Sequence, residues 1–223
     1  MIPFKAKYKD SEISFGVPTS YNDLTLRQLV RLNEWDKKDI VKLIAILCSI
    51  DYDVLFNSRM LDIDTQILPL LEWVKEPRDY QQLLVPKQIT IDGKQYDVPT
   101  DIAVKTLGQK ISLQLHLAQA QKESKDVIDC IPFALAVYFQ PEVTGRDYSE
   151  DEAIKLIPAI MNCKMLEAYP VGNFFLTNFI KFLTESNGSL AAKEPTKNFR
   201  QALIGWIPSA YLQRLTHSRK EIL

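Results

Sequence analysis

The stretch VPTSYNDLTLRQ, residues 17–28, returns later in the chain as VPTDIAVKTLGQ, residues 98–109. Six of the twelve positions are identical, and each identical pair is 81 residues apart. A phrase that occurs twice could be a ligand-binding loop used twice, or it could begin the same structural unit twice. The residues on either side of each copy favour the second interpretation.

Each copy follows a stretch with the pattern of a β-hairpin. In residues 88–98, apolar and polar side chains alternate on either side of Asp92-Gly93, which is a strong turn signal. Residues 4–17 alternate in the same way around a predicted turn at 9–11. Both hairpins end in Val-Pro, and the strand is expected to end there because proline has no amide hydrogen to donate.

Within each copy, a threonine is followed three residues later by a glutamine, which is the pattern of a capping box at a helix start. Thr25 is expected to accept a hydrogen bond from the amide of Gln28, whose side chain bonds back to the amide of Thr25. Thr106 and Gln109 are expected to form the same pair. Each box should stabilise the start of its helix by roughly 1 kcal/mol.

The apolar residues after each box predict the apolar side of a helix, less regular in the second copy. They are Leu26, Leu29, Val30 and Leu32 in the first copy and Leu107, Ile111, Leu113 and Leu115 in the second. A further, almost wholly apolar helix is predicted after Asp39 and again after Asp126, since an aspartate suits the positive end of a helix. These two aspartates are 87 residues apart, and an insertion of six residues in the loop between the helices would explain the larger offset.

Later segments complete each half. Helices are predicted over residues 58–77 and 148–170, and a long one near 174–184. Ser149 and Glu152 form another predicted capping box.

The sequence therefore predicts an α+β, predominantly α-helical fold with two tandem copies of a β-hairpin plus helices unit and a C-terminal helical appendage. The first hairpin-helical repeat is expected over residues 1–86 and the second over 87–187. Residues 188–223 are expected to hold a polar linker and a helical interaction segment.

Composition and charge exclude several classes of function. The 27 basic and 28 acidic residues give a net charge of −1, whereas a nucleic-acid binder usually has a basic excess. No signal-peptide pattern and no apolar run of about 20 residues is present, so we expect no membrane partner and an intracellular, soluble protein. The three cysteines, at positions 48, 130 and 163, lie inside apolar runs and are expected to be core thiols.

Candidate catalytic residues are few. Neither His116 nor His217 lies in a known motif for a catalytic nucleophile or a metal site. Gly93-Lys94 fits a hairpin turn better than a phosphate-binding loop. The pairs Asp51 with Asp53 and Asp62 with Asp64 could ligate a hard cation, but the glycine and closing glutamate of a calcium loop are missing. We therefore expect no catalytic, metal or cofactor-binding residues and no small-molecule substrate, with an enzyme or metal-binding protein using these acidic pairs as the alternative.

The C-terminal segment carries the candidate partner-binding residues, since tryptophan, tyrosine and arginine dominate interface hot spots. They are Phe199, Leu203, Trp206, Ile207, Tyr211 and Arg214. The alternative is that this segment docks onto the chain's own core.

Three stretches resemble a group of tailed-bacteriophage proteins associated with phages of Bacteroidetes hosts, including crAss-like phages. They are VPTSYNDLTLRQ, ITIDGKQYDVPTDIAVKTLGQ and FALAVYFQPEVTGRDYSEDEA, and the resemblance covers roughly residues 10–185. It implies a virion structural or assembly protein with no catalytic residues to carry over. The expected role is a ring or adaptor subunit of the portal, neck or tail, assembled in the host cytoplasm into the virion. The expected partners are other virion proteins and further copies of the chain in a homo-oligomeric ring; the alternative is a tail assembly chaperone absent from the mature virion.

Overall fold

The computed structural model of the chain describes residues 1–35, 38–58, 66–75, 83–99 and 104–190. The protein is mostly helical with two small antiparallel hairpins, so the predicted α+β, predominantly helical class is confirmed. Contacts divide the chain into one compact unit, Met1–Asn178, and a second, Phe179–Leu223. The division into three parts at residues 86 and 187 stays a prediction.

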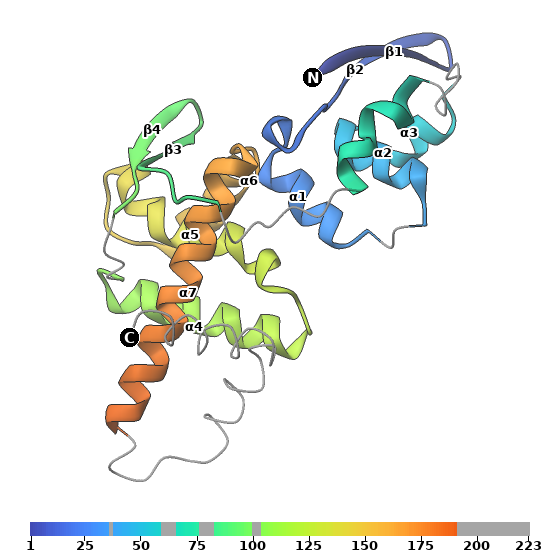
Figure 1. The fold of residues 1–223 in the computed structure, drawn as a ribbon. Coiled ribbons are helices and arrows are strands. Elements are labelled where there is room, and N and C mark those ends of the chain that lie inside the picture. The colour runs from blue at the N-terminus through green and yellow to red at the C-terminus, as the bar shows by residue number, and fades with distance from the viewer. Residues whose placement is uncertain (36–37, 59–65, 76–82, 100–103, 191–223) are drawn as a thin grey trace. The chain divides into compact units, whose positions relative to one another are not determined.

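The first half begins with a hairpin of β1 (Ile2–Tyr8) and β2 (Ser11–Val17) (Figure 1). In its register, Phe4 lies opposite Phe15. The turn at Lys9 has a positive φ of 53°, within the predicted turn at residues 9–11. The elements that follow are the 3₁₀ turn η1 (Tyr21–Asp23), the helices α1 (Leu26–Asn33), α2 (Ile40–Cys48) and α3 (Tyr52–Phe56), and the 3₁₀ stretch η3 (Leu68–Lys75).

The second half repeats this order with longer helices. A hairpin of β3 (Gln88–Ile91) and β4 (Lys94–Asp97) turns at Asp92 and Gly93, both at positive φ. The helices that follow are α4 (Leu107–Lys122), α5 (Val127–Thr144), α6 (Glu150–Met161) and α7 (Met165–Leu190). Hairpin, capped helix and apolar helix therefore occur twice in the same order (Figure 1).

The predicted six-residue insertion in the loop between the first two helices is wrong. The connection is shorter in the second half, where residues 123–126 replace 34–39. Instead α4 has 16 residues where α1 has 8. The added residues extend the helix by about two turns, because an α-helix has 3.6 residues per turn.

The two apolar helices are the most buried elements of their halves, as predicted. Every residue of α2 from Leu43 to Cys48 is buried, and so is the run from Cys130 to Val137 in α5. Asp39 and Asp126 are their N-terminal caps, which confirms the predicted helix starts. α7 crosses α5 closely, since a Cβ on Gly172 would lie 2.3 Å from Cγ2 of Ile131.

Candidate functional site

Both capping boxes of the repeated phrase are formed as predicted. Oγ1 of Thr25 accepts a hydrogen bond from the amide of Gln28 at 3.4 Å, and Oγ1 of Thr106 accepts one from the amide of Gln109 at 3.2 Å. In return, Oε1 of each glutamine accepts a hydrogen bond from the amide of its threonine, at 2.7 Å and 3.2 Å respectively. The phrase thus starts a helix in each half.

Each glutamine also makes a second contact, which the sequence did not predict. Both are buried, with only 3% of each residue exposed. Nε2 of Gln28 donates to the carbonyl of Leu47 in α2, and Nε2 of Gln109 donates to the carbonyl of Val137 in α5. The same residue therefore caps one helix and fixes it to the apolar helix that follows.

The predicted capping box at Ser149 and Glu152 is wrong, although Ser149 is the N-cap of α6. The Ser149 side chain makes no capping hydrogen bond. Its amide instead donates to Oε1 of Gln140 at 2.9 Å, while the Glu152 carboxylate forms an ion pair with Lys155 at 2.6 Å. The glutamate is thus held along its own helix and does not reach back to the cap.

The first copy of the phrase also joins the two halves of the Met1–Asn178 unit. The amide of Leu26 donates to the carbonyl of Cys163 at 2.9 Å, and the amide of Met165 donates to the carbonyl of Leu24 at 2.8 Å. These bonds form a short antiparallel bridge between the start of α1 and the corner of α6 and α7. No local sequence signal predicts it, because the partners are more than 130 residues apart.

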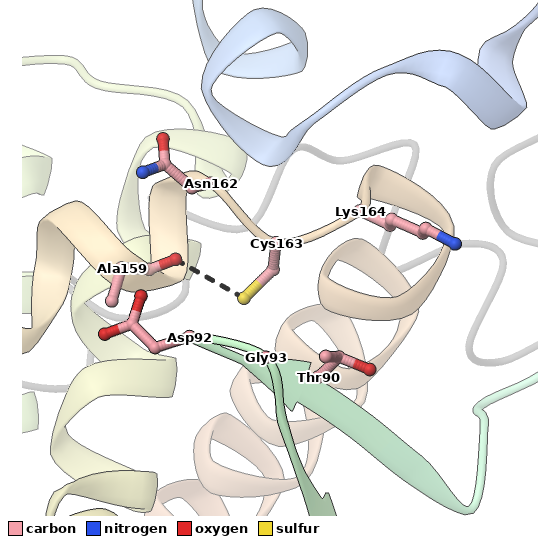
Figure 2. A pocket seen from close by; sticks show the side chains of 7 residues that line it. All are labelled: Thr90, Asp92, Gly93, Ala159, Asn162, Cys163 and Lys164. Carbon is pink, nitrogen blue, oxygen red and sulfur yellow. Dashed lines mark hydrogen bonds between the residues drawn. The ribbon is translucent and has the colours of Figure 1, made fainter.

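A pocket of about 370 Å³ opens between this corner and the turn of the second hairpin (Figure 2). The residues that line it are Thr90, Asp92, Gly93, Ala159, Asn162, Cys163 and Lys164. Figure 2 shows the Cys163 thiol directed at the carbonyl of Ala159, to which it donates a hydrogen bond at 3.5 Å. The amide of Thr90, one of the lining residues, donates to Oε2 of Glu167 at 2.9 Å.

The chemistry of this pocket does not favour covalent catalysis by its cysteine. Burial, and then the nearby charges of Glu167 and Asp92, raise the pKa of the Cys163 thiol to about 12. The thiol is therefore protonated near neutral pH, whereas the thiolate is the nucleophilic form. No histidine is among the lining residues to act as its base. The polar groups around the pocket instead hold the β3–β4 hairpin against the corner of α6 and α7.

His116 lies on α4 with its ring stacked on Phe133 at a centroid distance of 4.1 Å. Burial, and then the charge of Lys125, lower the pKa of this histidine below its usual value. A neutral ring packed against an aromatic ring suits a structural contact. His217 lies outside the described residues.

The other acidic and glycine candidates have structural contacts. Gly93-Lys94 is at the hairpin turn, and Asp51 caps α3 by accepting from the amides of Asp53 at 2.9 Å and Val54 at 3.2 Å. Within the described part of the chain, no three potential ligands among His, Cys, Asp and Glu are grouped as a metal site would need. The pair Asp62 and Asp64 lies outside that part.

The candidate partner-binding residues of the C-terminal segment also lie outside the described residues. They are Phe199, Leu203, Trp206, Ile207, Tyr211 and Arg214. Their predicted role stays a prediction.

The prediction that one apolar side of α4 packs inward needs correction. Leu113 is buried, but Leu107, Ile111 and Leu115 are 72%, 45% and 64% exposed. These three, called here the α4 stripe, follow one line of the helix at i, i+4 and i+8. The sequence could not separate the two sides, because α4 carries apolar residues on both.

A second set of exposed apolar side chains lies in the first half. Ile40, Tyr52 and Phe56, called here the α3 patch, are between 38% and 63% exposed. The rings of Tyr52 and Phe56 stack at 5.7 Å.

Comparisons with known proteins identify no relative: no family model matches the chain, and no curated protein or solved structure matches it. In the part of the chain that the structure describes, no helix is long and apolar enough to cross a membrane.

Proposed function

We propose that this chain is a non-enzymatic structural protein of a tailed-bacteriophage virion, a ring or adaptor subunit of the portal, neck or tail region. The observation that carries the proposal is the pair of exposed apolar surfaces, the α4 stripe and the α3 patch, on well-packed helices. Large apolar side chains in a line on a surface mark protein–protein contact. Residues 10–185 resemble phage structural proteins, and this resemblance is the reason for proposing that such contacts are made in a virion.

Mass spectrometry of purified virions tests this proposal. Peptides of the chain should be found in mature particles at a stoichiometry of several copies each. Absence from mature particles, together with co-purification with a long helical partner during assembly, would favour a tail assembly chaperone.

The competing proposal of a metal-dependent enzyme has its own test. Asp51→Asn combined with Asp53→Asn should leave any thermal response to divalent ions unchanged, because Asp51 is used as a helix cap. A stabilisation by Mg²⁺ or Mn²⁺ that this double variant abolishes would overturn the non-enzymatic proposal.

A further inference from the structure

The carbonyl of Val137 is an unusual hydrogen-bond acceptor, because it lies well inside a long helix. α5 spans Val127–Thr144 and continues for two turns beyond Val137. A carbonyl at such a place normally accepts from the amide four residues further along the same helix. For Val137 that residue is Pro141, which has no amide hydrogen. The carbonyl is therefore open to a donor from outside the helix.

An open carbonyl at this place needs a partner, because Val137 is fully buried, with 0% of the residue exposed. Buried backbone carbonyls in folded proteins are almost always paired. Nε2 of Gln109 donates the hydrogen bond at 3.0 Å, from a side chain that is itself buried. A bond from α4 thus replaces the bond that the proline removes from α5.

The first half makes the equivalent contact without a proline. Gln28 donates to the carbonyl of Leu47, which is the last residue but one of α2. The last four carbonyls of a helix have no amide of the same helix to pair with. α5 has 18 residues where α2 has 9, so α5 continues past its acceptor, and there Pro141 leaves the carbonyl open.

α5 contains a second proline, Pro132, which opens the carbonyl of Ile128 in the same way. Ile128 lies nine residues before Val137, about 14 Å along the helix axis. One glutamine side chain cannot span that distance, so Gln109 can bind only one of the two open carbonyls. Of the two, it binds the one that Pro141 opens.

A second contact joins the same two segments. Lys105, next to the N-cap Thr106, forms an ion pair with Glu142 at 2.7 Å. Both charged side chains are more than half exposed, and an exposed pair of this kind contributes little to stability. The buried bond to Val137 is therefore the contact that fixes the start of α4 against α5.

We propose that Pro141 makes a docking site for α4: by leaving the carbonyl of Val137 open, it gives the side chain of Gln109 one place to bind on α5. The carbonyls around Val137 accept from amides of their own helix, so the start of α4 is fixed at a single position along α5. This device belongs to the fold and does not depend on a role in a virion.

A double-mutant cycle on the full-length chain tests the device, with the folding equilibrium constant measured by urea unfolding. Gln109→Met should lower that constant at least about fivefold, because the Val137 carbonyl loses its partner. Pro141→Ala supplies an amide that can take over this carbonyl within the helix. In the Pro141→Ala background, the factor lost through Gln109→Met should therefore be at least about threefold smaller.

Two controls separate this coupling from a general effect of removing a proline. Pro158→Ala restores an amide in α6, at an exposed residue, and Gln109→Met should have the same effect there as in the wild type. Gln28→Met should have the same effect with and without Pro141, because its acceptor, Leu47, lies at the end of α2.

Three results would overturn this inference. Equal effects of Gln109→Met in the wild-type and Pro141→Ala backgrounds would mean that the restored amide changes nothing at the Val137 carbonyl. A Pro141→Ala chain that does not fold would mean that the proline ring is needed for its own packing. An equally large coupling to Pro158→Ala would mean that loss of a proline acts through overall stability. None of these results bears on whether the chain is found in virions.

Discussion

At the scale of single residues, Gln28 and Gln109 each cap one helix and join it to the next. Each accepts from the amide of its threonine and donates to a carbonyl of the next helix. A buried amide is stable only where its polar atoms find partners. These glutamines meet that condition because, in each half, the capped helix lies against the apolar helix and a carbonyl of that helix accepts from the glutamine side chain.

Gln109→Met should lower the free energy of unfolding by about 1–3 kcal/mol, because it leaves the Val137 carbonyl and the Thr106 amide without these partners. Urea unfolding followed by circular dichroism measures the change. Gln114→Met on the same helix, where the side chain is only partly buried, is the control and should change stability by less than about 0.5 kcal/mol. Equal effects at the two positions would show that the buried contacts contribute little.

Burial determines the protonation of the three cysteine thiols. Cys48, Cys130 and Cys163 are free and buried, which agrees with the prediction of core thiols. Burial is the largest cause that raises their pKa values, to about 12, about 11 and about 12.

The folded chain should therefore react with iodoacetamide at pH 8 far more slowly than the urea-unfolded chain. For Cys48, a pKa of about 12 in place of 9.0 reduces the thiolate fraction roughly a thousandfold. The unfolded thiols lose their protons at a lower pH than the folded ones. The contribution of these buried thiols to stability is therefore fully present below pH 9 and is lost as the pH rises towards their folded pKa values. Labelling of the native chain at the unfolded rate would contradict the burial of these thiols.

At the scale of the elements, the helix starts look alike in sequence but differ in how they are capped. The hydroxyl of Thr106 accepts a capping hydrogen bond, whereas Ser149 begins α6 without one. A pattern of residue types predicts where a helix begins. It cannot predict whether a competing partner, such as Lys155 for Glu152, takes one member of the box.

Thr106→Ala should destabilise the chain by about 1 kcal/mol, the usual contribution of a hydroxyl cap. Ser149→Ala should lower the stability by only a few tenths of a kcal/mol, since the Ser149 hydroxyl makes no capping hydrogen bond. Chemical denaturation of both variants measures the difference. If Ser149→Ala were the more costly, the box predicted from the sequence would form in solution after all.

The crossing of α5 and α7 depends on a glycine. Gly172→Ala places a methyl group 2.3 Å from Cγ2 of Ile131, closer than any real contact, so one helix must shift. Overpacking of this kind costs about 1–3 kcal/mol and alanine gains roughly 1 kcal/mol over glycine in a helix, so the net loss is up to about 2 kcal/mol. A lower thermal midpoint is therefore expected. Gly16→Ala is the control, because there the added methyl meets only the flexible side chain of Met1.

At the scale of the whole chain, the sequence predicts the repeated elements well because their signals are local. Asp92-Gly93 lies at its turn, and Thr25 with Gln28 begins its helix, because each depends on neighbours within four residues. The pocket beside Cys163 and the bridge to Leu26 could not be predicted, since they join residues far apart in the chain. The exposed stripe on α4 was also missed, because periodicity alone does not say which of two apolar sides faces inward.

The candidate partner-binding residues of the C-terminal segment belong to the second unit of the chain, Phe179–Leu223. Met1–Asn178 is a compact unit by itself, and both the α4 stripe and the α3 patch lie within it. A chain ending at Leu190 should therefore stay folded and keep its self-association. It should lose incorporation into particles, because it lacks Trp206 and the other candidate anchor residues.

Complementation of an infection with this truncated chain, followed by mass spectrometry of the virions, measures incorporation, and sedimentation velocity measures self-association. Full-length Trp206→Ala is the matched variant and should reduce incorporation without changing self-association, since only the anchor is removed. An insoluble truncated chain would show instead that the segment docks on the chain's own core. A truncated chain that is incorporated normally would place all of the assembly contacts within residues 1–190, and the α4 stripe and the α3 patch would then have to supply them.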